Sequence, residues 1–285
     1  MKDESVAAVV ITFNRLELLK EVLSAVKNQS RKPDKIIVVN NSSTDGTSEW
    51  LSDQNDIKVI TQENLGSSGG QYTGLNVAYE LGYEWIWTMD DDVVPDINCL
   101  ENLLNSNSKY LIRAPLRFDN NNKPYLNDAI SYNFTNPMKS LWVELINNEL
   151  LKKDYIEAIG ITFEGPLIHR SVIEKIGLPN INFFIFADDT EFFVKANRAG
   201  FKSIIVTSSK LYRKISLPDN IYKFSWKTYY IIRNLIWLDR IFGNFFVKYL
   251  RPFGYFLVWL FRSKSLSDIK TVFKAFKSGY FGRYN

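Results

Sequence analysis

Short apolar runs alternate with helical segments over the first 100 residues, and this alternation constrains the fold more than any other feature. The apolar runs lie at 6–11, 35–39, 57–60 and 83–89, and apolar residues at helical spacing fill 16–26. Strands separated by helices run parallel, with right-handed crossovers. The sequence therefore predicts an α/β fold, a Rossmann-like α/β/α sandwich with a mostly parallel central sheet.

Three adjacent aspartates, Asp90, Asp91 and Asp92, follow the run at 83–89. Like charges at the end of a buried strand repel, and burying them is costly. A Mg²⁺ or Mn²⁺ ion would resolve the conflict, because both favour carboxylates and share them with substrate phosphates. Since alternate side chains of an extended chain share a direction, Asp90 and Asp92 would face one cation while Asp91 faces elsewhere. A solvated acidic turn is the alternative explanation of the three aspartates. Pro95, which follows them, discourages further sheet pairing.

Polar residues also follow the other predicted strands, at Asn14, Asn40 and Asn64. Ligands of open α/β sheets collect at the carboxyl ends of strands, so this arrangement favours a ligand site over an acidic turn. The glycine-rich segment 63–72 precedes a predicted helix, where anions bind well, although a simple glycine turn explains it equally. It lacks a Walker lysine, and no GxGxxG follows the first strand, so neither an NTPase nor a dinucleotide-binding protein is supported.

A second acidic cluster, Asp188, Asp189 and Glu191, follows an apolar run at 183–187 that is predicted to be a strand. Acidic residues in a first helical turn suit the helix dipole, which is the structural explanation. A positioned carboxylate also suits a general base that deprotonates a hydroxyl. The Asn-rich region 105–154 is predicted to hold loops and short strands that shape an acceptor pocket.

Several single residues complete this part of the chain. Cys99 is the only cysteine, which excludes an internal disulfide and suits a reducing compartment. No signal peptide is expected, because the first residues lead directly into a short strand. Ser171 is predicted to cap a helix that Gly177 ends. The only histidine, His169, is expected to be structural or exposed.

The last 65 residues differ from the rest in charge and in aromatic content. Residues 221–285 hold 12 Lys and Arg against 2 Asp and Glu, a net charge of +10, whereas the first 220 carry −6. The same segment holds 20 aromatic residues in a helical pattern that begins at Ile221 and Tyr222. Its most apolar part, 241–261, contains Lys248, Arg251 and Pro252, and so lacks the run of about 18 apolar residues that a membrane span needs.

Basic residues interleaved with aromatic ones suit helices that lie in a membrane interface and bind anionic lipid. A helical cap over the catalytic domain and a homo-oligomer interface are two further explanations of the same pattern. Nucleic-acid binding has no recognition motif to support it.

Five segments, in this order, resemble the family 2 inverting glycosyltransferases with the GT-A fold, especially the galactofuranosyl- and rhamnosyltransferase-like branch of bacterial surface-glycan enzymes. Each segment is modest alone, but the ordered set is a specific match over about residues 5–215. The segments are VVITFNR (9–15), NNSSTDGT (40–47), ENLGSSGG (63–70), WIWTMDDDV (85–93) and DDTEF (188–192).

The resemblance implies that a nucleotide-sugar donor binds at the ends of the first strands, and it assigns two groups of residues to that donor. The nucleotide would contact Thr12, Asn14, Arg15 and Asn40. The diphosphate and donor sugar would lie near Asn64, Gly69, Gly70, Asp91 and Arg213.

The resemblance also implies the chemistry. Asp90 and Asp92 would hold Mn²⁺ or Mg²⁺ against the diphosphate, where the cation stabilises the leaving nucleoside diphosphate. Asp189 would deprotonate the acceptor hydroxyl for in-line attack on the anomeric carbon. Asp188 and Glu191 would belong to the acceptor region.

Two positions depart from the family pattern. Many relatives have Asp where this chain has Asn40. The family often supplies a histidine metal ligand about two dozen residues after the base, where this chain has Arg213. Arginine cannot ligate a cation but binds phosphate well, so Arg213 is predicted to contact the diphosphate directly.

The resemblance predicts a GT-A catalytic domain at 1–220, with a nucleotide-sugar half at about 1–100 and an acceptor half at about 101–220. A C-terminal helical extension at 221–285 would associate with a membrane or with a second copy. The enzyme is expected in the cytoplasm, peripheral on the inner face of the cell membrane.

The predicted function is inverting transfer of a sugar to a hydroxyl of a lipid-linked surface glycan, with UDP-galactofuranose as the first donor candidate and dTDP-rhamnose as the second. A GT-A-fold nucleotidyltransferase is a competing interpretation, although the segment 12–15 offers no glycine- and lysine-rich nucleotide loop. A non-catalytic glycan-binding or scaffold protein is another, and intact Asp90, Asp92 and Asp189 argue against it.

Overall fold

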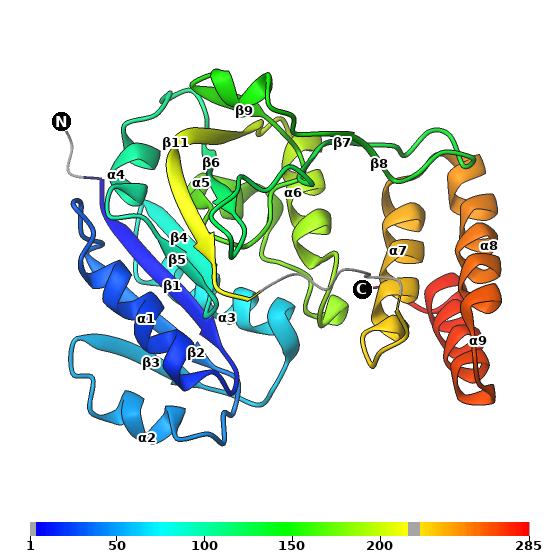
Figure 1. The fold of residues 1–285 in the computed structure, drawn as a ribbon, viewed down its shortest axis with the longest axis horizontal. Helices are drawn as coiled ribbons and strands as arrows, with labels where there is room; N and C mark the ends of the chain where they lie inside the picture. The colour runs from blue at the N-terminus through cyan, green and yellow to red at the C-terminus, as the bar shows by residue number, and fades with distance from the viewer. Residues whose placement is uncertain (1–3, 216–222, 285) are drawn as a thin grey trace.

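A computed structural model describes residues 4–215 and 223–284, so the predicted boundary at 220 and the helix start at Ile221 and Tyr222 lie outside the described residues. Figure 1 shows a central sheet covered by helices, with three C-terminal helices grouped at one end of the molecule. The strands are β1 (Val6–Thr12), β2 (Lys35–Asn40), β3 (Ile57–Thr61), β4 (Trp85–Asp90), β5 (Val93–Pro95), β6 (Ile112–Phe118), β7 (Ala129–Tyr132), β8 (Trp142–Leu145), β9 (Tyr155–Glu157), β10 (Leu167–His169) and β11 (Ser203–Arg213). The helices are α1 (Leu16–Lys27), α2 (Thr47–Ser52), α3 (Gly66–Glu80), α4 (Cys99–Leu104), α5 (Arg170–Ile176), α6 (Asp188–Arg198), α7 (Thr228–Phe242), α8 (Phe245–Arg262) and α9 (Leu266–Phe281), with short 3₁₀ turns at Leu150–Lys152 and Ile181–Phe183.

The main sheet has the order β3-β2-β1-β4-β10-β6-β11-β5, with β9 also paired to β11. The first four strands in this order are parallel, and β10 is inserted antiparallel between β4 and β6. One face of the sheet packs on α1 and α4, and the other packs on α3, α5 and α6. The predicted α/β sandwich with a mostly parallel sheet is therefore confirmed.

Helix α3 begins earlier than the sequence predicts, and this corrects the interpretation of the glycine-rich segment as a loop. Gly69 and Gly70 lie inside the helix and are buried. A Cβ on Gly70 would approach Ile11 Cγ2 to 2.5 Å, and one on Gly74 would approach Val9 Cγ1 to 2.3 Å. These glycines therefore let α3 pack closely on β1.

The segment 183–187 is not the strand that its apolar sequence predicts. It starts as a 3₁₀ turn and continues with left-handed backbone at Phe184, Phe186 and Ala187, with φ of 62°, 71° and 65°. The side-chain amide of Asn234, on α7, donates to three carbonyls of this segment and replaces the missing sheet bonds. These oxygens belong to Phe183, Ile185 and Phe186, at 3.0, 2.9 and 2.7 Å.

Two smaller predictions are corrected, and a third is made more specific. Ser171 was predicted to cap α5, but the cap is His169, whose ring Nδ1 accepts a hydrogen bond from the Ser171 amide. Strand β5 pairs with β11 although it ends in Pro95, since proline fits the edge of a sheet. The region predicted to hold loops and short strands contains the short strands β7 and β8, and also the seven-residue strand β6 inside the main sheet.

The C-terminal helices pack against the body of the protein. Helix α7 shares a buried apolar cluster with Phe134, Phe183 and Val194. In the part of the chain that the structure describes, no helix combines the length and apolar character needed to cross a membrane.

Candidate active site

The carboxyl ends of β1 and β4 meet at Asp91. The Thr12 hydroxyl donates to Asp91 Oδ2 at 2.8 Å, and the Phe13 amide donates to the same oxygen at 3.2 Å. Arg15 Nη1 lies 3.0 Å from Asp91 Oδ1 and 2.9 Å from Asp92 Oδ2. Asp91 is thus a structural link between the two strands, and Arg15 neutralises part of the aspartate charge.

Asp90 lies at the end of β4 with weak compensation for its charge. Its carboxylate receives a long hydrogen bond from Gln71 Nε2, at 3.4 Å. Desolvation raises the pKa of Asp90 well above its usual value, and the charges of Asp92, Glu164 and other nearby carboxylates raise it further. Such a group is suited to a cation.

The residues present fit a divalent cation that is shared with a substrate. Among the described residues, no group of three or more His, Cys, Asp or Glu side chains forms a cation site. Asp90 and Asp92 would supply two ligands, and diphosphate oxygens and water would supply the rest, as Mg²⁺ sites commonly allow. Asp92 would have to share its carboxylate with Arg15.

The N-terminus of α6 carries the second pair of carboxylates. Asp189 Oδ1 accepts the Thr190 amide at 2.6 Å and the Thr190 hydroxyl at 3.2 Å. Asp188 Oδ2 is buried without a hydrogen-bond partner among the described residues. Burial raises the pKa of Asp188 to about 7, helped by the charge of Asp189, and raises the pKa of Asp189 to about 6. Burial therefore makes both carboxylates of this pair bind a proton more readily than an exposed aspartate does.

Both carboxylates of this pair line a cavity of about 730 Å³. Aromatic side chains from the β7–β8 hairpin and from loops form part of its wall, and α7 contributes Leu235 and Leu238. Aromatic and aliphatic walls beside a few fixed polar groups are typical of ligand pockets. The cavity is also lined by Arg117, Tyr125, Asp128, Tyr132, Trp142, Glu164, Phe186 and Arg213.

Four of these residues form a buried ionic network. Arg117 pairs with Asp128 and with Glu164, the latter at 2.7 Å, and Arg213 Nη1 lies 2.6 Å from Glu164. Although burial works to raise it, the two arginines hold the pKa of Glu164 below its usual value. Arg213 Nε is buried and has no acceptor in the described chain, so one donor of this guanidinium is left unpaired.

The predicted donor residues differ in accessibility. Thr12 and Asn40 are buried, and the Asn40 side chain bonds Ser43 and Ser48, so both shape the strand ends from within. Asn14 is exposed, and its Oδ1 accepts the Thr44 amide at 2.7 Å. Asn64 Oδ1 accepts the Gly66 amide at the start of α3, at 3.0 Å. Donor binding by these residues stays a prediction.

The structure brings Asp188, Asp189 and Arg213 to one cavity. Glu191 does not line this cavity; its carboxylate lies 3.5 Å from the Lys195 ammonium, and its acceptor role stays a prediction.

The ionic network around Arg213 was not predicted from the sequence. Arg117 stands in the apolar run of β6, and Glu164 lies between Phe163 and Gly165. A charge inside an apolar run signals a buried ion pair, but it does not identify the partner.

Comparison with known proteins defines the class of this chain. Residues 7–177 match the model of glycosyl transferase family 2, and the chain belongs to this family. It is 30% identical over 205 residues to galactofuranosyltransferase GlfT1 of Mycolicibacterium smegmatis, covering 69% of this chain and 67% of that protein. It is 27% identical over 202 residues to the O-antigen chain rhamnosyltransferase RfbN of Salmonella typhimurium, covering 69% of this chain and 62% of that protein. The chain thus spans about two thirds of the length of these relatives.

The fold matches a solved glycosyltransferase. The crystal structure of GalNAc-T7 with UDP, GalNAc and Mn²⁺ superposes with a TM-score of 0.64 at 15% identity, covering 99% of this chain and 55% of that chain. At this identity the likeness is one of fold. The predicted family, GT-A fold and glycosyltransferase class are confirmed.

Proposed function

We propose that this glycosyltransferase moves a sugar from a nucleoside diphosphate donor to a glycan hydroxyl with inversion at the anomeric carbon. UDP-galactofuranose is the first donor candidate and dTDP-rhamnose the second, in line with the names of the two relatives. The observation that carries the proposal is the cavity of about 730 Å³ that brings Asp188, Asp189 and Arg213 together from distant parts of the chain.

In this proposal, the residues at the ends of β1, β2 and β4 bind the nucleotide, and the cavity beside α6 binds the acceptor. Asp189 takes the proton of the acceptor hydroxyl, and Thr190 fixes its carboxylate. Arg213 donates to the diphosphate while Glu164 orients its guanidinium. A Mn²⁺ or Mg²⁺ ion held by Asp90 and Asp92 would stabilise negative charge on the leaving nucleoside diphosphate.

A binding screen tests the donor site. Thermal unfolding is measured with UDP, dTDP, GDP or CDP, each with and without Mn²⁺, because a ligand that binds the native state raises its stability. We expect one nucleotide to raise Tm only with Mn²⁺, and Asp92→Ala to lose this shift. The control Asp53→Ala, in the loop after α2, should keep it. Equal stabilisation without Mn²⁺ would contradict the proposed cation site and indicate that Arg213 alone balances the diphosphate charge. If no nucleotide stabilises the protein, a non-catalytic role is favoured.

Product analysis separates sugar transfer from nucleotidyl transfer. We expect UDP to form from UDP-galactofuranose together with the glycosylated acceptor. Release of pyrophosphate from a nucleoside triphosphate and a sugar 1-phosphate would instead indicate a nucleotidyltransferase.

We further propose that α8 and α9 dock on an anionic lipid surface on the inner face of the membrane, where a lipid-linked acceptor would be presented. Helix α8 exposes large apolar side chains, among them Phe246 (58% exposed), Leu250 (54%) and Phe261 (86%). Basic residues on α9 and its flanks, such as Lys270 and Lys277, add attraction to anionic lipid.

Vesicle flotation tests this docking. Wild-type protein should float with phosphatidylglycerol vesicles and less with phosphatidylcholine vesicles, and Phe246→Ser/Phe261→Ser should stay in the soluble fraction. Ile97→Ser is the matched control, because Ile97 is 59% exposed but lies before α4. A wild-type protein that stays soluble and elutes as a dimer would assign the apolar surface to a second copy.

A further inference from the structure

The β7–β8 hairpin forms a wall of the cavity but stands apart from the main sheet. It is a separate two-stranded sheet, in which Tyr132 and Trp142 pair across the strands and both line the cavity. A two-stranded hairpin is marginally stable in isolation. The position of this wall therefore depends on contacts outside the hairpin.

The base of the hairpin is bonded to the body of the protein. The Ile159 amide donates to the Ile130 carbonyl and the Gly160 amide to the Ala129 carbonyl, both at 2.9 Å. These bonds fix the first residues of β7 and leave the tip of the hairpin, residues 133–141, beyond them.

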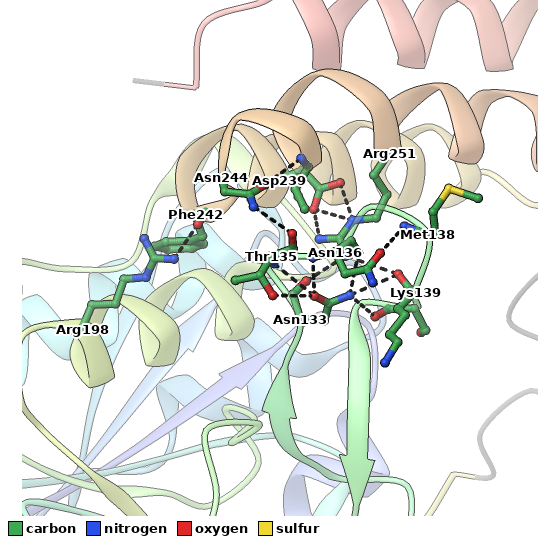
Figure 2. Close-up of polar contacts among 12 residues, drawn as sticks. Asn133, Thr135, Asn136, Met138, Lys139, Arg198, Asp239, Phe242, Asn244 and Arg251 are labelled. Atoms are coloured by element: carbon green, nitrogen blue, oxygen red, sulfur yellow. Dashed lines mark hydrogen bonds and ion pairs between the residues drawn. The ribbon is translucent and has the colours of Figure 1, made fainter.

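A buried arginine is one of the groups through which α7 and α8 hold the tip, as Figure 2 shows. Arg251 pairs with Asp239 through both Nε and Nη2, and its Nη1 donates to the Asn133 carbonyl at 2.7 Å. Arg251 is 4% exposed and Asp239 is 0% exposed. The guanidinium is thus divided between an ion pair within the helices and a bond to the hairpin.

Two further contacts, both from Asn244, link the start of α8 to the tip. The Asn244 amide donates to the Phe134 carbonyl at 2.9 Å, and Asn244 Nδ2 donates to the Thr135 carbonyl at 2.8 Å. Asn133 in turn organises the tip, because its Oδ1 accepts two tip amides and its Nδ2 donates to tip carbonyls.

We propose that Arg251 is a positioning residue for acceptor binding: it places the hairpin that carries Tyr132 and Trp142 against the cavity, with Asn244 as its partner. An ion pair that served stability alone would need no bond to the hairpin, whereas Arg251 joins three elements at the strand end next to Tyr132. The acceptor role of the cavity rests on the proposed function.

Arg251→Lys is the sharpest test. Lysine keeps the charge opposite Asp239, but its single ammonium cannot span the carboxylate and the Asn133 carbonyl as the planar guanidinium does. The matched control is Arg240→Lys, because Arg240 Nη1 likewise bonds two carbonyls, Gly279 and Gly282, but between α7 and α9.

Asn244→Asp is a second variant, which keeps the proposal testable if Arg251→Lys does not fold. Asn244 is exposed and caps α8 through its Oδ1, which aspartate can also do, so only the bond to Thr135 is lost.

Kinetics with UDP-galactofuranose and an octyl galactofuranoside acceptor provide the readout. We expect Arg251→Lys to raise the acceptor KM about tenfold, within the roughly 10²-fold that a misplacement of about 1 Å can cost, with donor KM and acceptor-free donor hydrolysis unchanged. Asn244→Asp should raise the acceptor KM less, and Arg240→Lys should not raise it. An unchanged acceptor KM in both hairpin variants, or an equal loss of transfer and hydrolysis, would overturn the proposal.

Hydrogen exchange separates failure of this inference from failure of the proposed function. If the wild-type enzyme does not turn over UDP-galactofuranose, the proposed donor is wrong. Hydrogen exchange alone then tests whether Arg251 positions the hairpin. Faster exchange at 129–145 in Arg251→Lys but not in Arg240→Lys would then support the positioning of the hairpin, and unchanged exchange there would overturn it.

Discussion

At the scale of single residues, the two buried carboxylates at the start of α6 differ in their hydrogen bonds. Asp189 accepts two hydrogen bonds from Thr190, while Asp188 keeps one buried oxygen without a partner in the described chain. Burial raises the pKa of both carboxylates, and the charge of Asp189 raises that of Asp188 further, so the pair favours holding one proton. A base beside a protonated neighbour is the arrangement expected for abstraction of a hydroxyl proton.

Asp189→Asn is expected to lower the rate of sugar transfer by about 10²- to 10⁴-fold, the usual contribution of a general base, and to leave nucleotide affinity unchanged. Steady-state kinetics and nucleotide titration check both parts. Asp188→Asn is the control. A larger loss of transfer rate in Asp188→Asn than in Asp189→Asn would assign the role of base to Asp188.

The free enzyme is expected to become more stable as the pH falls from about 7.5 to about 6. Asp188 and Asp189 have raised pKa values of about 7 and about 6, so the folded state binds their protons more tightly than the unfolded chain does. Their contribution to stability is present at low pH and is lost as the pH rises through these values. Thermal unfolding against pH measures the effect, which Asp188→Asn should reduce. A flat profile in the wild-type protein would contradict these shifts.

At the scale of elements, α3 depends on glycine for its close approach to β1. Gly70→Ala is expected to destabilise the protein by about 1–3 kcal/mol, because the new methyl overlaps Ile11 and overpacking costs this much. Gly254→Ala in α8 is the control: no atom lies within 4 Å of its Cβ position, so about 0.5–1 kcal/mol of stabilisation is expected from helix propensity. Urea unfolding measures both, and equal effects would refute the packing argument.

Periodicity predicted the elements whose burial is set locally. The strands β1 to β4 and helices α1 and α6 follow apolar patterns that are visible in the sequence. The pattern failed at 183–187, where Asn234, about 50 residues further on, overrides the strand tendency. It failed again at β6, because Arg113 and Arg117 interrupt the apolar run.

The candidate site was predictable to a similar extent. The aspartates stand at strand and helix ends, where a sequence signal exists, and these positions were predicted. The ionic network around Glu164 joins three distant segments, and no local pattern contains that information.

At the scale of the whole molecule, the C-terminal helices are part of the pocket. Helix α7 lines the cavity with Leu235 and Leu238 and holds the segment before Asp188 through Asn234. The predicted division at residue 220 therefore separates residues that build one cavity.

A chain that ends at residue 215 is expected to aggregate or to unfold cooperatively at a much lower temperature than the full chain. The truncation exposes the apolar cluster around Phe183 and removes the bonds that Asn234 makes. Size-exclusion chromatography and calorimetry test this outcome. A truncated chain that stays monomeric and retains nucleotide binding would show that the domain at 1–220 folds independently.

The bonds from Asn234 also have a consequence for synthesis. A ribosome completes both acidic pairs well before it adds α7, so in a nascent chain the segment before Asp188 and Asp189 still lacks the bonds from Asn234. Such a chain can assemble β1 to β4 first, while the cavity wall beside Asp188 forms only once α7 is present. The order of the elements along the chain thus delays an active pocket until the helices proposed to meet lipid are being made.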